Sequence, residues 1–386
     1  MNNLGIIFNF SIFDQFVDQK KYLITMLSNN FEKISLINSE NLAIGSKKKN
    51  YDISLLGSKV PYNFSILNPI NSKELSDILN KGNFLLIKSI PMTFSYFLLF
   101  RILKKTNTKL ILIHNIGVVG SNVKLSLIIK IKKFFFKKVP NIAIKLLTFI
   151  NYFQKIDYRF MSNKSLYEKK MNKFDILVKK NVLINSMQYD EYTSQKYEVL
   201  EKEIVFLETN ILGTDDYEIP KISEKQLKQI YEMSEAFLKS LSKLFNKKVT
   251  VCIHPSTNLE FMKKVYKDFN VTQYQTREKI YSSFITVFYE TSAIIDALIL
   301  KKNLIVLENR LMGETWLEYI NVYPKKYGVF KYDLFLKKDI IKSELLDAME
   351  KSKKNFDKFI SNYNNVKPNT NGVEDIIKIL KSNYVF

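Results

Sequence analysis

The chain has 386 residues, of which 46% are hydrophobic and 25% are charged. That length is more than one ordinary hydrophobic core needs, so we expect two domains. Lysine and arginine number 59 against 38 acidic residues, which gives a formal net charge of +21. The single Cys252 excludes an internal disulfide, and two histidines far apart in the sequence argue against a histidine-rich metal site. We therefore expect no metal and no obligatory cofactor.

The first half of the chain alternates strand-like apolar runs with helical stretches. The N-terminal residues lack the basic region and cleavage site of a signal peptide, and we interpret them as a first strand. The expected strands are Leu4–Phe8, Lys33–Ile37, Asn63–Leu67, Phe84–Ile87, Lys109–Ile113, Tyr158–Met161 and Val182–Asn185. The expected helices are Phe13–Ser28, Ser72–Leu79 and Thr93–Lys105. This alternation predicts a mostly parallel sheet with helices on both faces.

The second half repeats the alternation. Its expected strands are Ile204–Leu207, Val249–Ile253, Asn270–Tyr274, Phe284–Phe288 and Asn303–Leu307. Its expected helices are Glu224–Phe245, Leu259–Lys267, Arg277–Ser282, Ser292–Leu300, Ile340–Asn362 and Val373–Lys381. The pattern predicts an α/β fold of two Rossmann-like, doubly wound domains facing a central cleft. Ten glycines and no Gly-rich loop argue against a dinucleotide fingerprint or a P-loop.

The expected domain boundaries follow from this pattern. Residues 1–195 are expected to form an N-terminal Rossmann-like domain, and residues 196–365 a second, C-terminal one. The linker is expected near Gln188–Glu203. Residues 366–386 are expected to form a C-terminal helix, which can pack back on the N-terminal domain.

A basic, apolar segment distinguishes the first domain. No acidic residue occurs between Asp77 and Asp157, and Lys124–Lys145 carries seven lysines within KLSLIIKIKKFFFKKVPNIAIK. The lysines interrupt every apolar run before it reaches the roughly 20 residues that cross a bilayer. We therefore predict an amphipathic segment near residues 123–153 that lies on an anionic membrane surface. A buried helix whose lysines reach solvent is the alternative, and nucleic acid is not expected because no binding motif is present.

Both histidines stand where a buried strand should end. His114 closes KLILIH and His254 closes VTVCIH. The carboxyl ends of parallel strands are where open α/β sheets bind ligands. His114 and Asp14, which follows the first strand, are the candidate general bases at this edge of the first domain. The alternative for His114 is a hydrogen-bonded linker, and for Asp14 a charge in the first turn of a helix.

Three short segments of the second domain should meet at strand ends and bind a phosphate. The first is His254-Pro255-Ser256, the second is Thr276-Arg277, and the third is Glu290-Thr291-Ser292. Thr291 and Ser292 offer N-cap hydroxyls beside free backbone N–H groups at the predicted helix start. His254 can donate to the same phosphate, either protonated or through its neutral N–H.

The stretch from Val182 to Leu307 resembles bacterial surface-carbohydrate glycosyltransferases of the GT-B fold, the group that includes sialyl-, polysialyl- and Kdo-transferases. The resemblance rests on VLINSMQYDEY, IVFLETN, VTVCIHPSTN and YETSAIIDALILKKNLIVL. It implies that His254, Pro255, Thr291 and Ser292 hold the phosphate of a nucleotide-sugar. The family's usual aspartate is here Glu208, and Thr214, Asp215 and Asp216 stand where the family often has a histidine. Glu208, Asp215 and Asp216 are expected in a loop near the cleft. The resemblance also implies that residues 1–195 are the acceptor-side domain, with Asp14 or His114 as the base for an acceptor hydroxyl, and that residues 196–365 bind the nucleotide-sugar.

The resemblance implies a glycosyltransferase that builds lipopolysaccharide or capsule at the cytoplasmic face of an inner membrane. The preferred donor is a CMP-nonulosonate or CMP-Kdo-like sugar, and the acceptor is a glycan or lipid-linked glycan. A UDP- or GDP-sugar glycosyltransferase, a CDP-polyol phosphotransferase, and a non-enzymatic basic module that binds membrane or nucleic acid are the alternatives.

Overall fold

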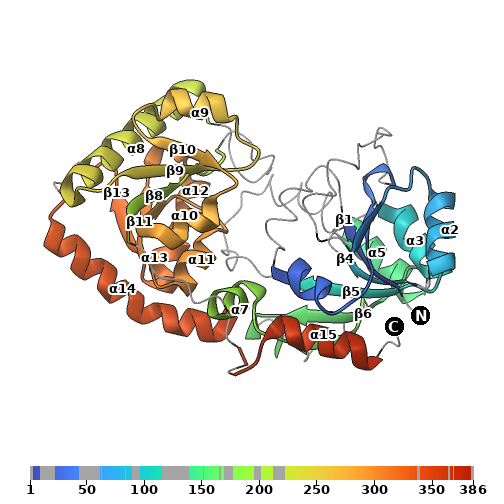
Figure 1. Ribbon diagram of the computed structural model, residues 1–386. Helices are drawn as coiled ribbons and strands as arrows, with labels where there is room; N and C mark the ends of the chain where they lie inside the picture. The colour runs from blue at the N-terminus through green and yellow to red at the C-terminus, as the bar shows by residue number, and fades with distance from the viewer. Residues whose placement is uncertain are drawn as a thin grey trace. The chain divides into compact units, whose positions relative to one another are not determined.

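The computed structural model divides the chain into two compact units, each organised around its own sheet (Figure 1). One unit contains the described residues of Met1–Ile116, Ile131–Glu191 and Asn362–Phe386, and the other contains those of Tyr192–Ser361. The residues described are 3–8, 22–42, 61, 63–82, 84–88, 96–114, 139–150, 152–164, 167–168, 177–194, 201–211, 222–336, 340–363, 366–367 and 369–383.

The first unit contains a seven-stranded sheet in the order β3-β2-β1-β4-β5-β6-β7. Every neighbouring pair of strands is parallel. The order reverses direction between β1 and β4, which makes this pair the topological switch point of the sheet. The strands are β1 (Asn3–Phe8), β2 (Ile34–Asn38), β3 (Phe64–Leu67), β4 (Phe84–Lys88), β5 (Lys109–His114), β6 (Ile156–Met161) and β7 (Val178–Leu183).

Helices cover both faces of this sheet because its strands are apolar on both sides. One hydrophobic cluster joins the strands to helical residues 22–28 and to the C-terminal helix α15 (Gly372–Asn383). The other cluster joins them to α2 (Ser72–Gly82), α3 (Phe97–Lys105) and α5 (Val139–Phe149). A 3-10 turn, η2 (Glu40–Leu42), follows β2, and α7 (Met187–Ser194) follows β7. The last helix of the chain therefore belongs to the core of the first unit.

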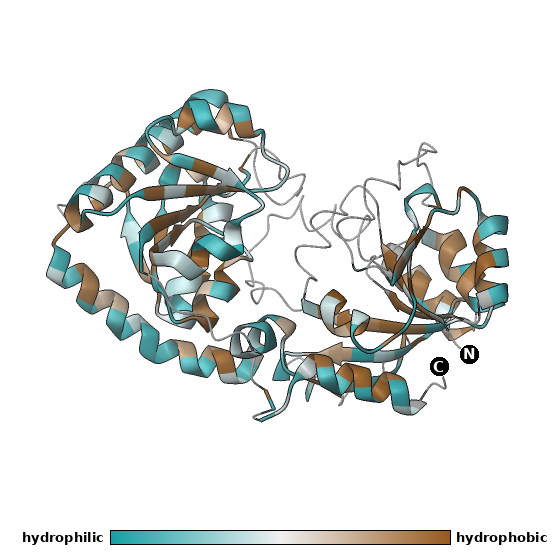
Figure 2. Ribbon diagram, viewed as in Figure 1, coloured by the Kyte–Doolittle hydropathy of each residue, from teal (hydrophilic) through white to brown (hydrophobic). Residues whose placement is uncertain are grey.

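The second unit contains a six-stranded parallel sheet in the order β10-β9-β8-β11-β12-β13. Its switch point lies between β8 and β11. Figure 2 shows the hydrophobic residues concentrated in the strands, and β9 and β12 are buried along nearly their whole length. The strands are β8 (Glu203–Leu207), β9 (Val249–Ile253), β10 (Asn270–Gln273), β11 (Ser283–Phe288), β12 (Asn303–Glu308) and β13 (Phe330–Asp333).

The longest helices of the second unit are α8 (Glu224–Phe245) and α14 (Lys342–Tyr363). Helix α8 begins with a capping box, in which the Ser223 hydroxyl accepts from the Gln226 N–H and the Gln226 side chain accepts from the Ser223 N–H. The shorter helices are α9 (Leu259–Val265), α10 (Thr276–Ser282), α11 (Ile294–Ile299), the 3-10 turn η6 (Arg310–Met312), α12 (Glu314–Ile320) and α13 (Val322–Tyr327). Among the residues described, no helix combines the length and apolar composition that crossing a bilayer requires.

The predicted α/β fold with two doubly wound sheets is confirmed, and the differences are local. Residues 187–194, where a linker was expected to begin, form helix α7. Strand β7 spans Val178–Leu183 rather than Val182–Asn185, because Ile156–Met161 pairs with the earlier residues. No helix or strand was predicted between Leu307 and Ile340. This region contains η6, α12, α13 and β13.

Candidate functional site

The candidate site is the carboxyl edge of the second sheet. Strands β9, β8 and β11 are neighbours in the sheet, so the loops that follow them lie next to one another. The switch point between β8 and β11 is bridged by Thr209 and Glu290. The Thr209 hydroxyl donates to the backbone carbonyl of Glu290 at 2.7 Å, and the Glu290 N–H donates back to the hydroxyl at 3.3 Å. These bonds fix the two loops that flank the position where open α/β sheets bind ligands.

His254 follows β9, one strand from the switch point, and its ring is held by the turn that it begins. Its Nδ1 lies 2.7 Å from the Ser256 hydroxyl and accepts the Ser256 backbone N–H at 3.2 Å. The Asn210 side-chain amide, which follows β8, donates to the same hydroxyl at 2.7 Å. His254 is exposed at this edge, but partial burial still lowers its pKa below the usual value, which favours the neutral ring. The structure thus brings His254 and Ser256 together as predicted, and it adds Asn210, which the sequence analysis did not select.

Gln273 is a second residue that the sequence analysis missed. It ends β10, and its side-chain amide lies within hydrogen-bonding distance of the carbonyls of His254 (3.3 Å), Pro255 (2.9 Å) and Thr257 (3.0 Å). The Tyr274 hydroxyl donates to the Pro255 carbonyl at 3.4 Å. The edge strand β10 therefore holds the backbone of the turn from His254 to Thr257 by hydrogen bonds. No local signal marks this role, because a glutamine at a strand end is ordinary until the strand order places it beside β9.

Thr291 and Ser292 differ from the prediction in one respect. The helix that they were expected to begin starts at Ile294, and Thr291 to Ala293 form a turn before it. The Thr291 hydroxyl accepts the Ala293 N–H at 3.2 Å, so it caps this turn rather than the helix. Ser292 is exposed at the same edge. The predicted helix start was therefore wrong by two residues. Both hydroxyl-bearing residues lie in the segment between β11 and α11.

Arg277 lies in the first turn of α10, directly after Thr276, which begins that helix. Its Nε is 3.7 Å from Oδ2 of Asp296 in α11, and its side chain is only 20% exposed. The guanidinium thus ties α10 to α11 at this edge, beside Tyr192, whose pKa is raised first by burial and then by the Asp296 charge. The binding of a phosphate by Arg277 and Thr276 stays a prediction.

Glu208 was expected in a loop near the cleft, but its side chain is buried. It is 6% exposed, and neither carboxylate oxygen has a hydrogen-bond partner. Burial raises its pKa to about 8, and the nearby backbone N–H of His254 lowers it only in part. This raised pKa favours the protonated, neutral carboxyl group at pH 7. It belongs to the packing behind the His-Pro turn rather than to an exposed loop.

Several of the remaining predicted residues fall outside the part of the chain that the structure describes. Asp14, Asp215 and Asp216 lie outside the described residues, as does most of Lys124–Lys145. The backbone of His114 ends β5 and pairs with Met161 of β6, at the carboxyl edge of the first sheet. Its role as a base stays a prediction. Within the part of the chain that the structure describes, no group of three or more His, Cys, Asp or Glu side chains is placed to hold a metal ion.

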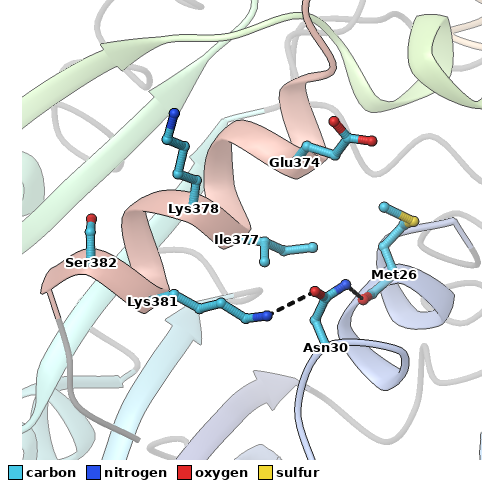
Figure 3. A pocket seen from close by; sticks show the side chains of 7 residues that line it. All are labelled: Met26, Asn30, Glu374, Ile377, Lys378, Lys381 and Ser382. Carbon is cyan, nitrogen blue, oxygen red and sulfur yellow. Dashed lines mark hydrogen bonds between the residues drawn. The ribbon is translucent and has the colours of Figure 1, made fainter.

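A surface hollow of about 500 Å³ lies elsewhere, between helical residues 22–28 and α15 (Figure 3). Lys381 donates to Asn30 across it at 3.0 Å. Asn30 precedes β2, so the hollow is at the amino edge of the first sheet, opposite the edge where α/β folds bind ligands. It is lined by Met26, Asn30, Glu374, Ile377, Lys378, Lys381 and Ser382.

Comparison with solved structures places the architecture. The wall teichoic acid polymerase TagF aligns with 99% of this chain and 89% of its own, at a TM-score of 0.55 and 12% identity. Phytolacca americana UGT2, complexed with UDP-2fluoro-glucose and pterostilbene, aligns over 99% of each chain at a TM-score of 0.56 and 9% identity. The chain has a GT-B fold.

A third similar structure is the UDP-GlcNAc 2-epimerase of Methanocaldococcus jannaschii in complex with UDP-GlcNAc and UDP, with a TM-score of 0.52 and 12% identity. It covers 98% of this chain and 99% of its own. No protein-family model and no curated protein sequence matches the chain. At these identities the likeness shows the fold, and the chemistry must be argued from this chain's own residues.

Proposed function

We propose that the protein is a glycosyltransferase that takes its sugar from a nucleotide-activated donor. The observation that carries this proposal is the convergence of the His254 turn, Thr209 and the Thr291-Ser292 turn at the carboxyl edge of the second sheet. In a GT-B fold this edge belongs to the donor domain. A donor N–H on His254 and hydroxyls from Ser292 and its neighbours suit the oxygens of a phosphate leaving group.

The preferred donor is a CMP-linked nonulosonate or Kdo-like sugar. This choice rests on the resemblance of the His254-Pro255 and Thr291-Ser292 motifs to CMP-sugar enzymes. UDP- and GDP-sugars are the runners-up, since two of the similar structures hold UDP compounds. The group that activates the acceptor hydroxyl would come from the first unit, with Asp14 and His114 as the candidates.

Nucleotide binding tests the proposal directly. Titration calorimetry of the full chain against CMP, CDP, UDP and GDP should give saturable binding to at least one, with CMP or CDP bound best. His254→Ala should weaken that binding by roughly 10- to 100-fold, since a charge-assisted hydrogen bond contributes about 1.5–3 kcal/mol. Glu260→Gln, on the exposed face of α9, serves as the control and should bind as the wild type does. Equal affinity of His254→Ala and wild type would refute the site.

A CDP-polyol phosphotransferase is the second candidate, and one observation favours it. Several of the similar structures are of the polymerase TagF, one of them soaked with CDPG. Such an enzyme would use the same edge but would transfer a polyol phosphate rather than a sugar. The mass of the product separates the two, because a phosphotransferase leaves CMP from a CDP donor and adds a phosphodiester to the acceptor.

The acceptor side is proposed to work at an anionic membrane surface. Helix α5, the end of the acid-free stretch, exposes apolar side chains at positions i, i+4, i+7 and i+8. Ile142, Leu146, Phe149 and Ile150 are 50% to 66% exposed. Exposed apolar side chains of this size beside lysines suit the interface of an anionic bilayer. A lipid-linked glycan would then be presented to the first unit.

A further inference from the structure

We infer that Asn210 is a positioning residue, which acts through Ser256 to hold His254 as the neutral ring with its proton on Nε2. The Ser256 backbone N–H lies 3.2 Å from His254 Nδ1. A backbone N–H can only donate. Nδ1 must therefore be the unprotonated nitrogen, and the proton of the neutral ring sits on Nε2.

The Ser256 hydroxyl links Asn210 to the ring, and we call the hydrogen-bonded chain Asn210–Ser256–His254 the relay. The hydroxyl oxygen accepts from the Asn210 amide at 2.7 Å, which leaves its own proton free to point at Nδ1, also 2.7 Å away. Two donors thus converge on one ring nitrogen. Protonating that nitrogen would set an N–H against both of them, so the relay opposes the charged ring in the same direction as burial does.

The charged and titratable groups around this edge do not oppose that result. Glu208 behind the turn is buried, and burial raises its pKa to about 8, which favours its neutral form at pH 7. Glu290 follows β11, and Arg277 in α10 is held by Asp296. Partial burial lowers the pKa of His254, and among the residues that the structure describes no charged neighbour adds to this shift.

This inference deepens the proposed function and rests on it for its purpose. With Nδ1 occupied by the turn, only Nε2–H is available to a ligand, and it is a donor over the whole neutral pH range. A donor of fixed position suits a phosphate oxygen. It also excludes His254 as a general base, because a neutral ring whose remaining lone pair is already bonded has no site for a proton from the acceptor.

The presence of only two histidines makes the test direct. Nitrogen NMR of the full chain labelled with 15N-histidine reports which ring nitrogen carries the proton, and His114→Gln assigns the two sets of signals. At neutral pH the wild type should show His254 as the Nε2–H form alone. Asn210→Leu and Ser256→Ala should each raise the pKa of His254 and introduce a measurable share of the Nδ1–H form.

Glu260→Gln is the control, because Glu260 is exposed on α9 and pairs with Lys263 rather than with the His-Pro turn. It should leave the proton on Nε2. A wild type with Nδ1–H, or equal effects from all three variants, would overturn the inference. No nucleotide is needed, so a correct tautomer without nucleotide binding would refute the proposed function alone. Tight nucleotide binding by a wild type with Nδ1–H would refute the relay alone.

Discussion

Glu208 shows how one residue at a strand end couples packing to pH. Its carboxyl group is buried among Tyr231, Tyr266 and Tyr289, whose pKa values are raised by burial and, to a smaller degree, by Glu208. The Tyr266 hydroxyl, like the Glu208 oxygens, has no hydrogen-bond partner. The side chain therefore adds packing volume in its protonated form and an uncompensated charge in its ionised form.

Replacing Glu208 with Gln should flatten the dependence of stability on pH. The folded pKa of about 8 lies above the usual value of 4.5, so the folded state binds the proton more tightly than the unfolded state does. Stability should fall as pH rises between those values, by up to about 1.4 kcal/mol per pH unit for this group. Denaturant unfolding at pH 5, 7 and 9 measures the slope. Glu232→Gln, on the exposed surface of α8, should keep the wild-type slope, and an unchanged slope in Glu208→Gln would contradict the burial.

At the scale of elements, the side chains of Asn185, before α7, and Asp190, in α7, anchor the C-terminal segment by hydrogen bonds to its backbone. The Asn185 side chain donates to the carbonyls of Lys367 and Thr370 and accepts the Lys367 N–H. Asp190 accepts the N–H groups of Gly372 and Val373 at the start of α15. These bonds satisfy the free donors of a helix N-terminus, and the apolar face of α15 then completes the core of the first unit.

Gly372→Ala should weaken this anchor. A Cβ at position 372 would lie 2.3 Å from the Asn185 carbonyl oxygen, and a backbone atom cannot rotate away. We expect a loss of about 1–3 kcal/mol, as for other overpacked positions. Denaturant unfolding measures it, with Lys378→Ala on the exposed face of the same helix as the control. A Gly372→Ala protein as stable as the control variant would show that the close approach can relax.

The burial of Asp190 adds a second pH effect to the same anchor. Burial raises its pKa to about 7, although the N–H groups of Gly372 and Val373 act to lower it. The acid therefore gains a proton on folding below neutral pH. Its contribution to stability should be largest below about pH 4 and lost as pH rises through 7, the same direction as for Glu208.

At the scale of the whole molecule, the net charge of +21 and the apolar face of α5 predict binding to anionic vesicles. Co-sedimentation should be strong with anionic vesicles, weak with neutral ones, and reduced by salt, because screening shortens the reach of the lysines. Leu146→Ser combined with Phe149→Ser should reduce binding several-fold. Ile70→Ser, which removes an exposed apolar side chain elsewhere, is the control. Equal pelleting with neutral and anionic vesicles, or none with either, would reject the membrane proposal.

The sequence alone determined the features that depend on neighbouring residues. Val249–Ile253 is an unbroken apolar run and forms a buried strand over the predicted residues. Glu224–Phe245 has apolar residues at helical spacing behind a Ser-x-x-Gln capping box, and both of its ends match the prediction. The placement of His254 at a strand end follows from the same local pattern.

Only the tertiary structure decided which side chains surround that histidine. Asn210 follows β8, His254 follows β9, and Gln273 ends β10. They meet because the sheet runs in the order β10-β9-β8. Strand order is set by the packing of helices on the two faces, which no single segment encodes. The burial of Glu208 was decided in the same way. A strand-end carboxylate is expected to face solvent, but here it is surrounded by Tyr231 of α8, Tyr266 at the end of α9 and Tyr289 directly after β11.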